Sequence, residues 1–181
     1  MSNLKDLTWE HHKNAERQAF VKEMFSGNLE PKKYAYFLFQ QHAIYDALEA
    51  MAMMHGLFND MPEIRRGPKI LEDAQELWPL KIGTPELCNT TKEYGKYLLS
   101  IMEDKDKIMA HVYVRHMGDL AGGQMIAKKV PGAGRMYQFD RDHMELKEAV
   151  RAKLNDDMAE EAKVCFDFAT KLFQELENVQ L

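Results

Sequence analysis

The sequence predicts an all-α fold, a compact multi-helix bundle. Three observations support this prediction. Apolar residues recur at the 3.6-residue helical period over more than twenty residues from Tyr34 to His55. No stretch of useful length alternates apolar and polar residues as a strand does, and no internal repeat is present. Proline, glycine and short polar stretches divide the remaining chain into segments of helical length.

The first half of the chain is expected to hold a helix over 6–16, a short helical turn over 20–25, a long helix from Pro31 to about His55, a helix over 70–78, and a helix from Thr84-Pro85-Glu86 through Met102. Pro31 suits the first turn of a helix, and Pro79 stops the helix before it. Thr84 resembles an N-cap residue. The segment 56–67, which ends just before Pro68, is expected to be a connector.

The second half begins with a charged turn over 103–107. One helix should follow over 106–129, carrying three glycines and ending at Pro131-Gly132-Ala133-Gly134, and helices over 143–154 and 157–176 should complete the chain. The last helix shows a spacing typical of a buried stripe, made of Ala162, Phe166, Ala169, Phe173 and Leu176.

Length and composition favour a single cytoplasmic domain over residues 1–181. A chain of 181 residues can bury a sizeable core, and 45% hydrophobic with 29% charged residues is typical of globular proteins. The net charge of −5 offers nucleic acid no attraction. No apolar run approaches 18 residues, which argues against a signal peptide or membrane span. Cys88 and Cys165 are expected to be free thiols in a reducing compartment, and a monomer is the default expectation.

The stretch from Tyr113 to Gln124 stands out because a helix there would carry Gly118, Gly122 and Gly123 in its interior. Each glycine costs about 0.5–1 kcal/mol relative to alanine in a helix. Two explanations remain open at this point: close packing of another helix, or a flat ligand lying against bare backbone with the helix bent to fit it.

Other polar pairs share helix faces. Arg115 and Asp119 are four residues apart, as are His12 and Glu16, and Lys147 and Arg151. The first pair favours a site beside the glycines over a surface ion pair. The last suits a two-point grip on a dianion, although a solvated basic face is the favoured explanation until a ligand is proposed. The sequence has no Glu-x-x-His pair, no Cys-x-x-Cys, no nucleophile elbow and no Gly-x-Gly-x-x-Gly loop.

Three segments resemble the haem oxygenase family over about residues 4–178. The glycine stretch, Tyr113-x-Arg115-x-x-Gly118-Asp119-Leu120-x-Gly122-Gly123-Gln124, is similar to the distal-helix signature of that family nearly residue for residue. His12-x-x-Ala15-Glu16 matches its proximal-histidine segment, and Glu160-Glu161-Ala162-Lys163-x-x-Phe166 with Leu172-Phe173-x-Glu175-Leu176 matches its last core helix.

The resemblance implies oxidative opening of haem b to biliverdin, with the α position as the expected cut, and release of carbon monoxide and iron. Haem would be both substrate and cofactor. O2 and an external electron donor are required, with a soluble low-potential donor such as ferredoxin expected and a downstream bilin reductase as a further partner.

The resemblance also assigns roles. His12 becomes the axial ligand of haem iron, with Glu16 beside it, and the three glycines become the surface under the other haem face. Asp119 organises the water that delivers protons, supported by Tyr45, Tyr94, Tyr113 and Arg115. Tyr113 also belongs to the expected haem contacts. Lys5, Lys147 and Arg151 are expected to hold the propionates, and Phe166 and Phe173 to wall the pocket.

The sequence departs from the family pattern at two positions, and two alternative functions remain open. Family members often carry an asparagine where this chain has Ala169, and Trp9 stands where a further basic propionate partner is expected. A thiaminase-like enzyme would need a catalytic cysteine with paired carboxylates, and only Cys165 in the last helix fits that pattern. A non-catalytic haem carrier or sensor would use His12 and the glycines without needing Asp119.

Overall fold

The computed structural model describes residues 2–181, and this part of the chain contains helices and turns but no strand. The expected all-α fold is confirmed. The α-helices are α1 (Leu4–Leu7), α2 (Trp9–Glu16), α3 (Ala19–Ser26), α4 (Pro31–Met54), α5 (Gly67–Leu77), α6 (Asn89–Ile101), α7 (Lys105–Leu120), α8 (Gly123–Ile126), α9 (His143–Arg151) and α10 (Ala159–Glu177). Short 3-10 turns lie at Pro62–Ile64, Leu80–Ile82, Arg135–Tyr137 and Asp156–Met158.

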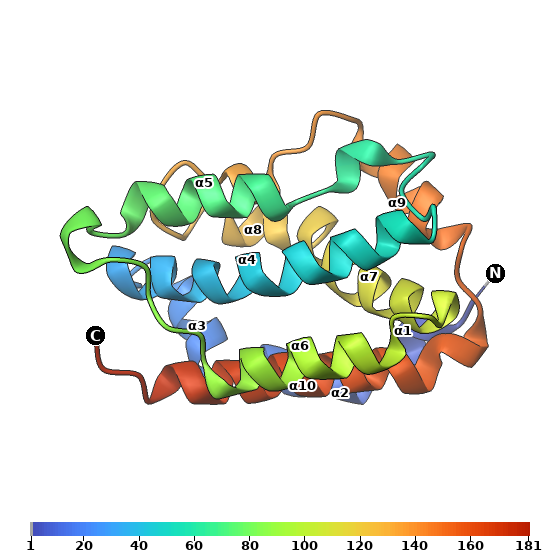
Figure 1. Cartoon of the computed structure of the whole chain (residues 1–181), viewed down its shortest axis with the longest axis horizontal. Helices are drawn as coiled ribbons and strands as arrows, with labels where there is room; N and C mark the ends of the chain where they lie inside the picture. The colour runs from blue at the N-terminus through green and yellow to red at the C-terminus, as the bar shows by residue number, and fades with distance from the viewer. Residues whose placement is uncertain (1) are drawn as a thin grey trace.

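Two long helices, α4 and α10, organise the bundle (Figure 1). Helix α4 packs on α5, α6 and α7, whereas α10 packs on α2, α3, α6 and α7. Helices α6 and α7 therefore contact both long helices. Because α2 and α7 both pack on α10, the expected His12 segment and the glycine stretch share one supporting helix.

The prediction for α4 is confirmed along its length. Pro31 occupies its first turn, and the helix runs for 24 residues. Leu38, Leu48 and Ala52 are fully buried at helical spacing, as the sequence pattern indicates. Apolar burial on this face places α4 in the centre of the core.

The N-terminal helix differs from the prediction. The expected helix over 6–16 is two helices, α1 and α2, separated at Thr8. The Thr8 hydroxyl donates to the Leu4 carbonyl at 2.7 Å and satisfies an oxygen at the end of α1. The short turn expected over 20–25 is a full eight-residue helix, α3, which ends at Gly27 in the left-handed conformation, with φ of +78°.

Helices α5 and α6 begin at other residues than predicted because distant side chains cap them. Helix α5 starts three residues early, since the Glu49 carboxylate accepts from the backbone N–H groups of Arg66 (2.6 Å) and Gly67 (2.8 Å). Helix α6 starts at Asn89 instead of near Pro85. The Glu175 carboxylate accepts from the N–H groups of its first two residues at 2.9 and 2.8 Å, so the cap comes from α10.

The glycine stretch is not one helix. Helix α7 ends at Leu120, Ala121 leaves the helical region with φ −105° and ψ −87°, and α8 is a separate short helix that ends at Ile126. Only Gly118 lies inside α7. The Gln124 side chain donates from Nε2 to the Tyr137 carbonyl at 2.9 Å, which fixes the new direction of the chain after the break.

The last two helices are confirmed with shifted ends, since α9 stops at Arg151 and α10 runs from Ala159 to Glu177. The predicted buried stripe of α10 is only partly right. Ala162 and Leu176 are fully buried, but Phe166, Ala169 and Phe173 are partly exposed. The buried positions between them are Cys165, Thr170 and Leu172.

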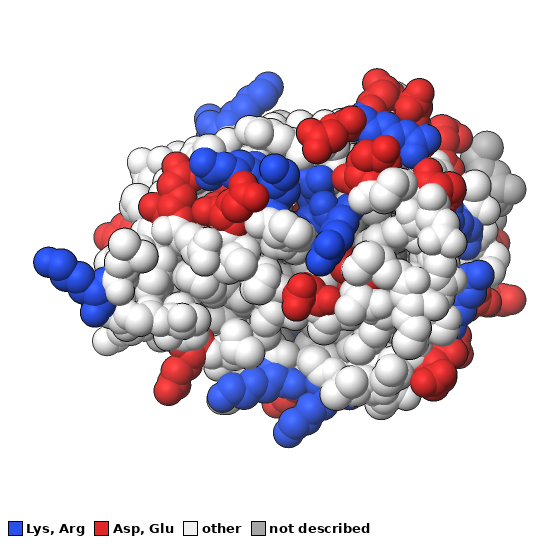
Figure 2. Space-filling view, turned by 45° about the horizontal axis from the view of Figure 1, so that its top comes forward, with Lys and Arg blue, Asp and Glu red and all other residues white. Residues whose placement is uncertain are grey.

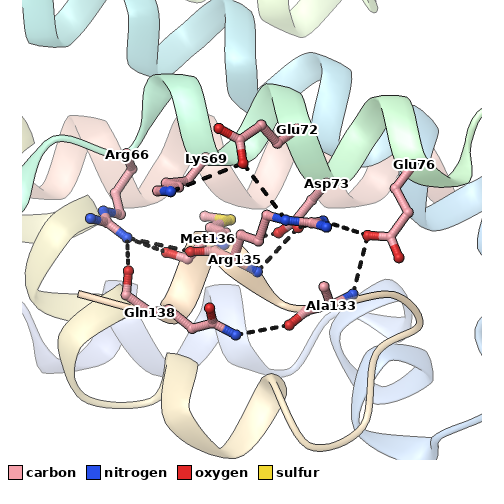
Figure 3. A network of polar contacts seen from close by, with 9 residues as sticks. All are labelled: Arg66, Lys69, Glu72, Asp73, Glu76, Ala133, Arg135, Met136 and Gln138. Atoms are coloured by element: carbon pink, nitrogen blue, oxygen red, sulfur yellow. Dashed lines mark hydrogen bonds and ion pairs between the residues drawn. The ribbon is translucent and has the colours of Figure 1, made fainter. Parts of the chain in front are cut away.

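An ion-pair network ties the segment after α8 to α5 (Figure 3). The buried Asp73 carboxylate accepts from the backbone N–H groups of Arg135 (3.1 Å) and Met136 (2.8 Å) and from the Arg135 guanidinium (3.1 Å). Arg66 donates to the Gln138 carbonyl at 2.6 Å. This network positions the neighbouring Tyr137, which packs behind the break in the glycine stretch.

Charged side chains of both signs lie close together in the upper part of Figure 2. Ion pairs join Arg135 to Glu76 of α5 and Arg141 to Glu145 of α9. Residues 2–181 hold no helix with the length and apolarity that crossing a membrane requires.

Candidate functional site

Two of the three glycines present bare backbone to open space. A Cβ added to Gly118 would have no neighbouring heavy atom within 4 Å, and one added to Gly122 would approach only the Gly118 carbonyl oxygen, at 3.8 Å. No other helix covers this backbone, so the helix-packing explanation does not hold for these two positions. An open backbone surface of this kind can accept a flat ligand.

Gly123 has different surroundings from Gly118 and Gly122. A Cβ there would lie 2.5 Å from the Tyr137 ring, closer than real Cβ contacts, and Tyr137 is buried. The missing side chain of Gly123 is therefore explained by packing against Tyr137. The open backbone surface shown here belongs to Gly118 and Gly122, and the role of Gly123 in ligand binding stays a prediction.

His12 lies on the exposed side of α2. Its ring stacks on Phe166 of α10, with centroids 5.1 Å apart and planes 12° apart, and its Nε2 lies 2.7 Å from Glu16 Oε1. Its side chain is 36% exposed. The adjacent His11 forms a separate pair with Asp167 at 2.8 Å. Both histidines place an imidazole nitrogen near a carboxylate, and His12 in addition stacks on an aromatic ring.

A buried polar cluster stands beside the open glycine surface. We call it the Asp119 cluster, and it consists of Tyr45, Tyr94, Arg115 and Asp119. Tyr45 of α4 donates to Asp119 Oδ2 at 2.7 Å, and Arg115 Nε donates to the Tyr94 hydroxyl of α6 at 3.3 Å. Helix α7 supplies Arg115 and Asp119 from one face, as the spacing of four residues predicts. All four side chains are buried.

Burial dominates the electrostatics of Asp119. It raises the pKa of the carboxyl group to about 7, although His116, the Tyr45 hydrogen bond, Arg66 and Arg115 each favour the charged form. Asp119 and Arg115 are not in direct contact, since no ion pair within 4.0 Å joins them in the described chain. A carboxyl group that titrates near neutral pH can hold or release a proton during a reaction.

Tyr113 does not join the Asp119 cluster. It is half-buried near Thr8 and Arg151, where burial raises the pKa of its hydroxyl and both neighbours oppose that rise. Arg151 itself is exposed and pairs with Glu148 at 2.9 Å, whereas Lys147 is half-buried. Lys5 is exposed and lines an open hollow with Asp6 and Trp9. We call these four residues, Lys5, Tyr113, Lys147 and Arg151, the polar edge; they lie on α1, α7 and α9, and Tyr113 and Arg151 lie close together.

Phe166 and Phe173, the two aromatic residues expected in the pocket wall, pack against different neighbours. Phe166 contacts His12, whereas Phe173 packs against Phe20 (6.0 Å between centroids) and Phe37 (6.1 Å). Phe173 therefore belongs to an aromatic group next to α3 and α4.

Sequence reasoning missed several buried polar residues of this region. His116 of α7 lies 2.8 Å from Glu49 of α4, and both are buried behind Tyr45. His111 of α7 lies 2.8 Å from Glu161 of α10. A signal existed for Glu49, because it is one turn from Tyr45 on the predicted helix. The sequence gave no signal for His111 and His116, since their carboxylate partners lie 50 and 67 residues away along the chain.

Comparison with known proteins gives a consistent result. The family model described as "Heme oxygenase" matches residues 1–175. The chain is 27% identical to "Heme oxygenase 2" of Macaca fascicularis over 206 residues, covering 97% of this chain and 64% of the relative. It is 29% identical to "Heme oxygenase 2" of Synechocystis sp. over 204 residues, covering 95% and 80%. The chain thus spans somewhat less than two thirds of the macaque relative.

Solved structures share the fold. The structure of heme oxygenase from Leptospira interrogans superposes with a TM-score of 0.81 at 28% identity, covering 95% of this chain and 97% of that one. Heme oxygenase-2 from Synechocystis sp. in complex with heme and NO gives a TM-score of 0.85 at 26% identity, covering 97% and 84%. The likeness therefore extends over nearly the whole of both chains.

Proposed function

Because this chain belongs to the haem oxygenase family, we propose that it binds haem b and catalyses its oxidation by O2 to biliverdin, carbon monoxide and free iron. The observation that carries the proposal is the open backbone at Gly118 immediately beside Asp119, a buried carboxyl group whose pKa is raised to about 7. The first feature suits a flat substrate, and the second suits proton delivery to it.

The residues present fit haem. A macrocycle needs a surface without side chains, which Gly118 and Gly122 offer. It also needs an axial ligand, and His12 has a partly exposed imidazole stacked on Phe166. In this structure Nε2 faces Glu16. If the ring turns over, the same carboxylate accepts from Nδ1–H and leaves Nε2 available to the iron.

Haem supplies the iron that takes up oxygen and the ring that is oxidised. The protein supplies everything else. His12 would hold the iron, and Glu16 would orient the His12 ring. Gly118 and Gly122 would keep side chains away from the macrocycle. Asp119 holds a proton near neutral pH, and Tyr45 fixes its carboxyl group by donating to Oδ2.

The polar edge is proposed to bind the propionates. Lys5, Lys147 and Arg151 provide positive charge, and Tyr113 provides a hydroxyl group near Arg151. Holding the propionates fixes the rotation of the ring and so decides which ring position is oxidised; the α position is our proposal. The electrons are proposed to come from a low-potential external donor of the ferredoxin type, with a bilin reductase as consumer of the product.

The test compares Asp119→Ala with Asp106→Ala, an exposed aspartate on the same helix. Each protein receives one equivalent of haem, and its absorption spectrum is followed after a reducing system is added in air. Wild type and Asp106→Ala should form a Soret band that then bleaches as broad red absorption rises. Asp119→Ala should form the Soret band and keep it.

Two other outcomes count against the proposal. Unchanged turnover in Asp119→Ala would remove the role of that carboxyl group. A wild-type Soret band that persists, with ascorbate as well as with a protein donor, would identify a non-catalytic haem carrier or sensor.

A further inference from the structure

A second buried polar chain lies behind Tyr94 and has no part in the function proposed above. The Tyr94 hydroxyl contacts His111 Nδ1 and lies 3.5 Å from Cys165 Sγ. On its other side, His111 Nε2 lies 2.8 Å from Glu161 Oε1, which also accepts from the Tyr97 hydroxyl. Helices α6, α7 and α10 meet here, and His111 is fully buried. The chain leads from a partly exposed carboxylate on α10 into the Asp119 cluster.

The hydrogen positions in this chain follow from the donors and acceptors available. An ionised carboxylate only accepts, so His111 Nε2 carries the hydrogen that points to Glu161. A neutral His111 then has a bare Nδ1, and the Tyr94 hydroxyl donates to it. The Tyr94 oxygen keeps its lone pairs for Arg115 Nε–H, 3.3 Å away. Glu161 and His111 together therefore set the orientation of the Tyr94 hydroxyl group.

Arg115 depends on that hydroxyl group. Within residues 2–181, no carboxylate lies within 4.0 Å of its guanidinium, and the Tyr94 hydroxyl is the acceptor for its Nε–H. The guanidinium also lies over the Tyr94 ring, 4.6 Å from its centroid. Tyr94 thus places the positive charge of Arg115, which is one of the charges that favour the ionised form of Asp119.

We propose that His111, held by Glu161, is a positioning residue that acts through Tyr94 and Arg115 on the carboxyl group of Asp119. The part of the proposal that concerns haem turnover rests on the function proposed above. The link itself is a property of this chain and exists without haem.

The contacts in this chain shift the pKa values of His111 and Glu161. Burial favours an uncharged His111, but Cys165 and Glu161 outweigh it and raise the His111 pKa above its usual value. Burial likewise opposes ionisation of Glu161, but hydrogen bonds from His111 and Tyr97 lower its pKa, as does nearby Lys107.

Two further charged or titratable groups belong to this chain: Tyr94, which contacts His111, and Arg115, which donates to the Tyr94 hydroxyl. If His111 is protonated, Nδ1 becomes a donor and the Tyr94 hydrogen turns to Cys165.

The test compares Glu161→Gln with Glu160→Gln. Glu160 is the adjacent, exposed glutamate, and it pairs with Lys163. Its replacement by glutamine changes the net charge of the protein by the same amount. The pKa values of His111 and Asp119 are measured by NMR in the haem-free protein. In Glu161→Gln the His111 pKa should fall by about one unit, because its carboxylate partner is gone. In Glu160→Gln it should not move.

The Asp119 pKa is the sharper measurement. Removing a negative charge would by itself lower the pKa of another carboxyl group. A displaced Arg115 has the opposite effect, so Glu161→Gln should raise the Asp119 pKa by about half a unit. Tyr94→Phe should also raise it, and adding Glu161→Gln to Tyr94→Phe should cause no further rise. A fall in Glu161→Gln, or a further rise in the double variant, would overturn the proposal.

Turnover provides the second readout. Glu161→Gln should slow haem turnover about tenfold and move its pH profile, whereas Glu160→Gln should match wild type. Equal rates in the two variants would overturn the link to catalysis. If wild type itself does not oxidise haem, the proposed function is wrong, and the two pKa measurements still decide whether His111 positions Arg115.

Discussion

The two faces that would enclose the ligand differ in how far they are organised in its absence. On the α2 side, His12 is 36% exposed and its partner Glu16 is 56% exposed. On the α7 side, Tyr45 and Asp119 are buried and joined by a 2.7 Å hydrogen bond. The α7 side is preorganised by the fold. The α2 side is open to solvent.

This difference in burial predicts which substitutions affect ligand binding alone and which also affect the stability of the fold. An exposed side chain with an exposed partner contributes little to folding, so its loss should be visible only in ligand binding and turnover. A buried carboxyl group with a raised pKa costs stability, so its removal should be visible in both. The following predictions test this contrast, beginning with the largest effect.

His12→Ala should lower turnover by at least about 1,000-fold, because no other residue on α2 replaces the axial ligand. The free energy of unfolding without haem should change by no more than about 0.5 kcal/mol, since His12 is partly exposed. Turnover assays and urea unfolding measure the two quantities. The control is His11→Ala, which removes the neighbouring imidazole and its pair with Asp167. Equal turnover in the two variants would contradict the assignment of His12.

Asp119→Asn should change how stability depends on pH. The folded-state pKa of Asp119, about 7, is raised above the value of 3.8 expected when unfolded. Between these values the folded state binds more protons than the unfolded state, so stability falls as pH rises through this range and is level above it. The total loss is at most about 4 kcal/mol.

The amide variant lacks this titration and should become more stable relative to wild type as the pH rises from 5 to 8. Urea unfolding of the haem-free proteins at several pH values measures the difference. Asp106→Asn, at an exposed position of the same helix, should follow wild type. If the unfolding free energies of wild type and Asp119→Asn changed in parallel with pH, the Asp119 carboxyl group would be solvated.

The same contrast explains which parts of the fold the sequence predicts. Helix α4 is predicted well because its information is local: Pro31 at the start and 24 residues of apolar period. The starts of α5 and α6 are missed because Glu49 and Glu175 cap them from other helices. The break after α7 is missed because Tyr137 lies beyond the predicted helix.

The site follows the same rule. Resemblance identifies Tyr45 and Asp119, and the structure brings them into contact. It cannot distinguish Gly123, whose neighbour Tyr137 depends on the network around Asp73, nor find His111, whose partner is on α10. His12 remains a prediction as the axial ligand, because an exposed imidazole beside Glu16 and Phe166 does not by itself assign that role.

Gly118→Ala and Gly123→Ala should have opposite effects on stability. The added Cβ of Gly123→Ala meets the buried Tyr137 ring, and overpacking of this kind costs about 2 kcal/mol. Gly118 lies inside α7 facing open space, so alanine should stabilise the haem-free protein by up to about 1 kcal/mol. Thermal unfolding and haem titration should show that Gly118→Ala is the variant that binds haem more weakly. Destabilisation by Gly118→Ala would mean that its backbone surface is covered.

Arg151→Ala should have the smallest effect. Its guanidinium is exposed and already paired with Glu148, so it contributes about 0.5–1 kcal/mol to propionate binding at low salt. Haem affinity should fall about threefold, and the fall should shrink as salt is added, because salt screens exposed charges. The control is Lys171→Ala, an exposed cation that pairs with Glu93 on α6. An affinity loss in Arg151→Ala that persists at high salt would show that haem binding buries this charge, and the α9 edge would then be part of the enclosed site.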